Sequence, residues 1–170
     1  VTLASVALAK SVTATNNTDT TGNNVVVGEE ITYTLTATIP EGQLTSATLV
    51  DTTDACLAIT GFDSLNASGG VSSTNGSMAA VLAAVSVANV GGGTANDGRR
   101  LTLDFGTLTN SDTNNASAET ITLVYRATAV NSASCSRGDA RNNSAVMTWD
   151  TTSTATVSAT DVIIQEPAVT

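Results

Sequence analysis

The sequence predicts an all-β protein whose strands form a two-layered sandwich. Thr, Ser, Val, Ala, Asn and Gly dominate the 170 residues, whereas the strong helix formers are scarce. That mixture favours strands joined by polar turns. Many short segments also alternate apolar and polar residues, with turn residues between them. At 17.0 kDa the chain is long enough to bury one core, so we expect a single domain over 1–170.

The expected strands follow one another along the whole chain. The clearest covers 31–39, where five apolar residues alternate with four threonines before Pro40 ends the pattern. The others cover 3–13, 25–27, 45–51, 56–60, 101–105, 119–130, 143–149 and 155–164. Many short strands separated by turns are typical of an immunoglobulin-like β-sandwich.

One alanine-rich segment does not follow this strand pattern. Met78, Val81, Leu82 and Val85 recur at helical spacing, which predicts a short helix over about 77–88 in a crossover loop. An alternating strand over 81–89 fits the same residues nearly as well. The sequence does not separate these two interpretations.

Composition excludes several classes of function. The net charge of −9 and the pI near 4.1 argue against binding to nucleic acid or to an anionic membrane surface. No apolar run approaches the roughly 20 residues that span a bilayer. There is no histidine, no phosphate-binding glycine loop after a strand and no nucleophile elbow, so we do not expect an enzyme. No calcium-loop motif is present either, and we expect neither a metal nor a cofactor.

The two cysteines, Cys56 and Cys135, lie far apart in the sequence. Two thiolates without histidine make a poor zinc site, and no CxxC motif is present. An acidic β-rich chain with an even number of cysteines is typical of secreted or surface-displayed proteins, in which a disulfide forms. We therefore expect a Cys56–Cys135 disulfide in an extracellular protein. Two buried free thiols in a cytosolic protein are the alternative.

Three strands each carry a polar residue in phase with apolar neighbours. The only lysine, Lys10, shares a strand face with Val6, Leu8 and Val12. Asp51 is likewise in phase with Ala47 and Leu49, and Asn143 with Ala145, Met147 and Trp149. A strand end, a turn or a loop cap would explain each of the three residues alone. A buried charge, however, needs a partner or a chemical fate, and the three together point to a common site.

These contexts resemble the isopeptide-forming fimbrial domains of bacterial surface proteins. The resemblance runs from about Leu8 to Trp149, with an alanine-rich insert and two cysteines that the family does not require. It is carried by the segments 8–12, 28–35, 47–52, 105–110, 119–123 and 143–146. In that family a lysine on the first strand is joined to an asparagine on a late strand, with the help of an acid. The resemblance implies these roles for Lys10, Asn143 and Asp51 respectively. The inward phase selects Asn143 over its neighbour Asn142.

The resemblance also implies a function. We expect a structural domain of an extracellular fibre, pilus or adhesin stalk, present as one repeat of a tandem array or one subunit of a fibre. Its partners are then neighbouring copies, joined end to end through a Glu166-Pro167 linker or by strand exchange through the termini. The alternative is an adhesin module that binds a host or surface ligand through loops such as 61–76 or 91–98. The sequence shows no signal peptide, so we expect a mature form or an excised segment.

Overall fold

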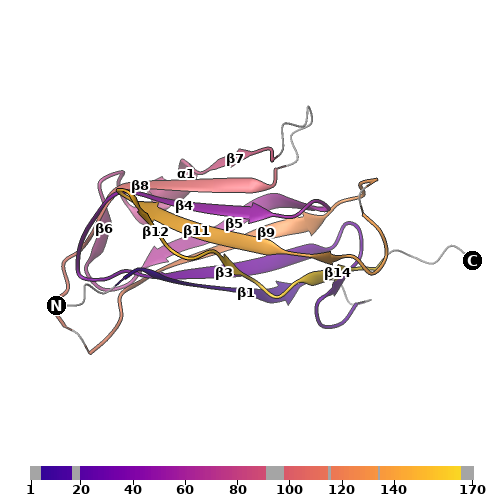
Figure 1. Cartoon of the computed structure of the whole chain (residues 1–170), viewed down its shortest axis with the longest axis horizontal. Coiled ribbons are helices and arrows are strands. Elements are labelled where there is room, and N and C mark those ends of the chain that lie inside the picture. Colours follow the sequence, from indigo (N-terminus) through magenta and orange to yellow (C-terminus); the bar gives the residue numbers. More distant parts are fainter. Residues whose placement is uncertain (1–4, 17–19, 91–97, 115, 134, 166–170) are drawn as a thin grey trace, which may run out of the picture.

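Two antiparallel sheets form the body of the computed structural model, which describes residues 5–16, 20–90, 98–114, 116–133 and 135–165 (Figure 1). The first sheet has the strand order β1-β3-β9-β5. Its strands are β1 (Ala7–Thr15), β3 (Glu30–Thr38), β9 (Thr120–Ala129) and β5 (Leu57–Ala67). The all-β sandwich expected from the sequence is confirmed.

The second sheet has the order β12-β11-β4-β8-β6, with β13 also paired to β11 and β7 to β8. Its long strands are β11 (Asn143–Trp149), β4 (Gly42–Thr53) and β8 (Arg100–Asn110). Its short strands are β12 (Thr152–Ser153), β6 (Val71–Ser73), β13 (Val157–Ser158) and β7 (Ser86–Ala88). A third, small sheet joins β10 (Ala140–Arg141), β14 (Val162–Ile164) and β2 (Asn24–Val25).

Apolar residues of both large sheets fill the space between them. In β3 every second residue from Ile31 is buried, and β9 shows the same alternation from Ile121. From the second sheet, Leu49, Leu103 and Met147 are buried in the same core. The period of two seen in the sequence therefore reports the inward face of these strands.

The alanine-rich segment contains both a helix and a strand. The helix α1 runs from Met78 to Ala83, and the Ser77 side chain caps it by accepting a hydrogen bond of 3.2 Å from the Ala80 amide. Its Val81 is buried. Strand β7 then begins at Ser86 and pairs with β8. The helix is thus shorter than expected, and the strand starts later than the alternative of 81–89.

Strand β5 corrects one expectation. Its register with β9 shifts twice, between Ile59 and Gly61 and between Phe62 and Ser64. Each shift breaks the alternation, so the sequence pattern ends at residue 60 while the strand continues to Ala67. Together with β6 it occupies most of the segment 61–76, which is therefore not a long ligand-binding loop. In the other candidate loop, 91–97 lie outside the described residues.

The ends of the chain also differ in detail from the sequence expectation. Strand β1 begins at Ala7, and residues 3 and 4 of the expected first strand lie outside the described residues, as do Glu166 and Pro167. The expected strand 155–164 is two short strands, because the chain leaves β11 after β13 and pairs with β10 and β2 as β14. Strand β1 starts toward one end of the long axis and β14 lies toward the other (Figure 1). No helix among the described residues is long and apolar enough to cross a membrane.

Candidate functional site

Lys10 lies on β1, at the edge of the first sheet, and points into the sandwich. It is paired with Leu35 of β3, so the two side chains share the inward face. The Lys10 side chain has no solvent exposure. The sequence pattern predicted this orientation, and burial removes the water that normally solvates an ammonium group.

Asp51 and Asn143 approach Lys10 from the second sheet. They lie on the neighbouring strands β4 and β11, where Asp51 is paired with Ala145 and Asn143 with Thr53. Their side chains therefore occupy diagonal positions on the same inward face. Both residues are buried, with Asp51 at 0% and Asn143 at 1% exposure. The structure thus brings all three polar residues that the sequence singled out to one place.

The Lys10 amino group contacts an oxygen atom from each of three side chains. Its Nζ donates to Asp51 Oδ2 in a very short contact, to Asn143 Oδ1 at 2.7 Å and to Tyr125 Oη at 2.9 Å. The acid contacts Lys10 and Tyr125, while the carboxamide oxygen of Asn143 accepts from Lys10. The amine thus lies beside both the acid and the carboxamide.

Tyr125 is the member of the site that the sequence did not reveal. Its ring lies on β9 and is fully buried. Its hydroxyl donates to Asp51 Oδ1 at 2.8 Å and accepts from Asn143 Nδ2 at 2.7 Å. An inward tyrosine in an alternating strand is ordinarily a core residue. The signal available in the sequence was that a buried phenol needs a hydrogen-bond partner.

Two tyrosine rings form the wall of the site on the first sheet. Tyr33 and Tyr125 are paired across β3 and β9, and their rings stack with centroids 5.5 Å apart. The Lys10 Nζ lies 5.4 Å from each ring centroid. This distance allows a cation–π attraction while the amine is protonated.

Burial shifts the ionisation of the Lys10–Asp51 pair toward the neutral forms. Desolvation lowers the pKa of Lys10 from 10.5 to about 8, although the neighbouring Asp51 carboxylate opposes the shift. Desolvation also raises the pKa of Asp51 above 3.8, against the effect of Lys10 and of the Tyr125 hydroxyl. The two shifts favour transfer of one proton from the ammonium to the carboxylate. A neutral amine is a nucleophile, whereas an ammonium is not.

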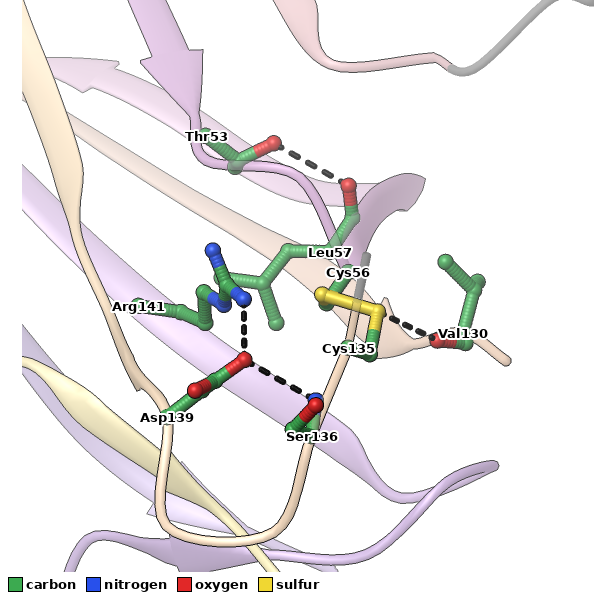
Figure 2. The surroundings of a disulfide bond; sticks show 8 residues. All are labelled: Thr53, Cys56, Leu57, Val130, Cys135, Ser136, Asp139 and Arg141. Atoms are coloured by element: carbon green, nitrogen blue, oxygen red, sulfur yellow. Dashed lines mark hydrogen bonds and ion pairs between the residues drawn. A yellow bond between two sulfur atoms is a disulfide. The ribbon is translucent and has the colours of Figure 1, made fainter. Parts of the chain in front are cut away.

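A disulfide joins two loops at the margin of the first sheet (Figure 2). Cys56 precedes β5, and Cys135 follows β9 by six residues (135 − 129 = 6). The Cα atoms are 5.7 Å apart, and the Cys135 sulfur lies 3.6 Å from the Val130 carbonyl oxygen. In the same loop, Asp139 accepts hydrogen bonds from the Ser136 amide and from Arg141. The structure therefore contains the pairing expected from the sequence.

Among the described residues, no cluster of His, Cys, Asp or Glu is arranged to hold a metal ion. The candidate site is the hydrogen-bonded group formed by Lys10, Asp51, Tyr125 and Asn143. It contains a nucleophile in direct contact with an acid and with a carboxamide. These are the groups that an amide exchange between two side chains needs.

Solved structures of major pilins have the same fold. The full-length pilin SpaD of Corynebacterium diphtheriae superposes with a TM-score of 0.52 and 17% identity, over 93% of this chain and 35% of that one. The major pilin BcpA of Bacillus cereus superposes with a TM-score of 0.52 and 15% identity, over 94% of this chain and 40% of that one. The pilus backbone protein RrgB of Streptococcus pneumoniae superposes with a TM-score of 0.51 and 16% identity, over 86% of this chain and 53% of that one.

No protein-family model matches the sequence, and no curated protein matches it significantly. The chain spans only about a third to a half of the length of these three pilin structures. At 15–17% identity, the likeness concerns the architecture of the domain. The chain therefore has the immunoglobulin-like sandwich fold that is found in parts of these major pilins.

Proposed function

We propose that this chain is a structural domain of an extracellular fibre, pilus or adhesin stalk, stabilised by an autocatalytic isopeptide bond between Lys10 and Asn143. The observation that carries the proposal is the contact of 2.7 Å between Lys10 Nζ and Asn143 Oδ1, in a site where both side chains are buried. The fold shared with major pilins supports the structural role.

The reaction would proceed once in each molecule. Lys10 transfers a proton to Asp51 through their direct contact, and the neutral amine attacks the Asn143 carbonyl carbon. The protonated Asp51 then offers a hydrogen to the carboxamide oxygen as negative charge develops there. Ammonia leaves, and Lys10 and Asn143 are joined by a secondary amide. The fixed geometry supplies the effective molarity that such a slow exchange needs.

The bond would enclose 134 residues (143 − 10 + 1 = 134) and join the two sheets. If the entropy model for disulfides is applied, this closure stabilises the folded state by about 5 kcal/mol. Unlike a disulfide, the bond survives a reducing environment. A force applied along the chain would pass from β1 through the cross-link into β11. This path suits a domain that transmits tension, either as one repeat of an array or as one subunit of a fibre.

Single-molecule pulling from both termini in reducing buffer tests the mechanical role. With the bond in place, the 132 residues between the two cross-linked positions (143 − 10 − 1 = 132) cannot extend. The Lys10→Arg variant keeps the positive charge but cannot form the amide. We expect it to lengthen by roughly 450 Å more than the natural protein when it unfolds. Equal extensions would contradict the proposed function.

A further inference from the structure

We propose that the Tyr125 hydroxyl carries the proton that must pass from the attacking nitrogen of Lys10 to the departing nitrogen of Asn143. This inference rests on the proposed cross-linking reaction and assigns a catalytic residue to it. Tyr125 comes from β9 of the first sheet, and it lies between groups that the two different sheets contribute.

The position of the hydroxyl supports this role. Tyr125 Oη lies 2.9 Å from Lys10 Nζ and 2.7 Å from Asn143 Nδ2, so it contacts both nitrogens of the exchange. It also donates to Asp51 Oδ1 at 2.8 Å. The orientation of the Asn143 carboxamide agrees with these contacts, because its oxygen faces the lysine, which can only donate, and its NH₂ group faces the phenol.

The balance of the reaction requires such a carrier. After attack on the Asn143 carbonyl carbon, the Lys10 nitrogen holds one proton too many, and the Nδ2 nitrogen needs one more to leave as ammonia. A bond forms between Nζ and the carbonyl carbon, and the bond from that carbon to Nδ2 breaks. Tyr125 accepts the proton from Nζ and gives its own hydrogen to Nδ2. The hydroxyl ends as it began, and no charge remains on it.

Asp51 and Tyr125 would then have separate tasks. Asp51 contacts Lys10 and Tyr125, which fits removal of the first proton from the ammonium. Tyr125 reaches the leaving nitrogen as well. The Tyr125 O–H group, which points at Asp51, has to turn toward Asn143 Nδ2. This requires only rotation about the phenolic C–O bond. Burial and the Asp51 carboxylate hold the pKa of Tyr125 well above 10, so the phenol keeps its proton at neutral pH.

Tyr33 offers a matched control. It is the other tyrosine of the chain, and its ring is equally buried and stacked on that of Tyr125. Within the described part of the chain, the Tyr33 hydroxyl makes no hydrogen bond of good geometry, although it lies close enough to the Asn143 side chain to interact with it. Tyr33→Phe and Tyr125→Phe therefore remove the same atom from neighbouring rings. The second change removes the hydrogen bonds to both reacting nitrogens, and the first change leaves those hydrogen bonds in place.

The experiment follows the intact mass of the freshly synthesised chain over time, for the natural protein and for both variants. Each bond formed lowers the mass by about 17 Da through loss of ammonia. We expect Tyr125→Phe to react on the order of 100-fold more slowly than the natural protein, and Tyr33→Phe to be slowed far less, because it keeps the hydrogen bonds to both nitrogens. Equal rates for the natural protein and Tyr125→Phe would overturn the role of Tyr125 and leave the cross-link intact. No mass loss in the natural protein would overturn the proposed function itself.

A second measurement covers the case in which Tyr125→Phe fails to fold. In the Tyr33→Phe background Tyr125 is the only tyrosine, so 3-fluorotyrosine supplied during synthesis is incorporated at that position alone. Fluorine makes the phenol more acidic and leaves the shape of the ring almost unchanged. We expect the rate of mass loss to change at least twofold. An unchanged rate would overturn the proposal, because a purely structural hydroxyl is insensitive to its acidity.

Discussion

Lys10 and Asn143 are 133 residues apart in the sequence, yet the lysine Nζ lies 2.7 Å from the asparagine Oδ1. The two residues belong to facing sheets, so this contact connects the two layers of the sandwich. Both side chains are buried, and Asp51 and Tyr125 complete the group. Four polar side chains at the inner face of a β-sandwich are costly unless each is satisfied by the others.

Replacement of Asn143 should abolish the cross-link, whereas replacement of its neighbour should not. Asn142 donates to Asp161 at 2.7 Å and takes no part in the Lys10 contacts. We expect Asn142→Ala to keep the mass deficit of about 17 Da and Asn143→Ala to lose it. Denaturant unfolding in reducing buffer should then show Asn143→Ala to be less stable by at least about 5 kcal/mol. A mass deficit retained in Asn143→Ala would assign the bond to another residue.

Removal of the acid should leave a buried ammonium without its partner. Asp51→Ala cannot neutralise Lys10, so we expect no cross-link and an additional loss of stability. The double variant Lys10→Met/Asp51→Ala also lacks the bond but buries no charge. We expect it to be more stable than Asp51→Ala by roughly 3 kcal/mol, because breaking a buried ion pair costs more than replacing it with apolar groups. Equal unfolding free energies at pH 7 would show that the ammonium is not confined in the interior.

The rate of cross-linking should depend on pH in a way that reports the shared proton of the Lys10–Asp51 pair. The reactive form contains a neutral Lys10 amine and a protonated Asp51. It differs from the ion pair only in the position of one proton, which has passed from the ammonium to the carboxylate. Its population is constant while the pair holds one proton. The pair loses that proton as pH rises through the lowered pKa of Lys10, about 8, and gains a second one below the raised pKa of Asp51.

We therefore expect a rate plateau near neutral pH. Above about pH 8 the rate should fall about tenfold per pH unit, because the pair has lost its proton. The rate should also fall at acidic pH, and this fall should begin above pH 3.8, the ordinary pKa of an aspartate, because burial raises the pKa of Asp51. Timed mass spectra of freshly synthesised chains, quenched at each pH, measure this profile. A rate that instead rises through pH 8 and then levels off would mean that the reaction does not need a protonated Asp51.

The disulfide and the isopeptide bond should contribute separately. The disulfide closes 80 residues (135 − 56 + 1 = 80), which corresponds to about 4.5 kcal/mol in the entropy model. We expect the double variant Cys56→Ala/Cys135→Ala to be less stable by a similar or smaller amount, because the isopeptide bond already shortens the loop. Its mass should still show the loss of ammonia. Absence of that loss would mean that the disulfide has to form before the two sheets can bring Lys10 and Asn143 together.

The sequence predicted the site where strands alternate regularly. Lys10, Asp51 and Asn143 were each identified from a polar side chain in phase with apolar neighbours, and all three lie on the inward faces of their strands. The contact between them could not be derived from periodicity, because it depends on which strands face each other. The family resemblance supplied that pairing.

Two features were missed for physical reasons. The second half of β5 was not predicted, because register shifts around Gly61 and Asp63 break the period of two on which the prediction depended. Tyr125 was recognised as an inward residue but not as a polar member of the site. An aromatic ring at a core position satisfies the hydrophobic pattern, and the pattern contains no information about the partner of its hydroxyl.

The intact mass of the purified, reduced protein shows whether Lys10 and Asn143 are covalently joined. We expect a mass about 17 Da below that of the sequence, because reduction opens the disulfide and leaves the isopeptide bond intact. Lys10→Arg and Asp51→Ala should both show the full sequence mass, and fragmentation of the natural protein should yield a branched peptide that contains Lys10 and Asn143. A reduced natural protein with the full sequence mass would mean that no isopeptide bond forms and that Lys10 and Asp51 remain a buried ion pair.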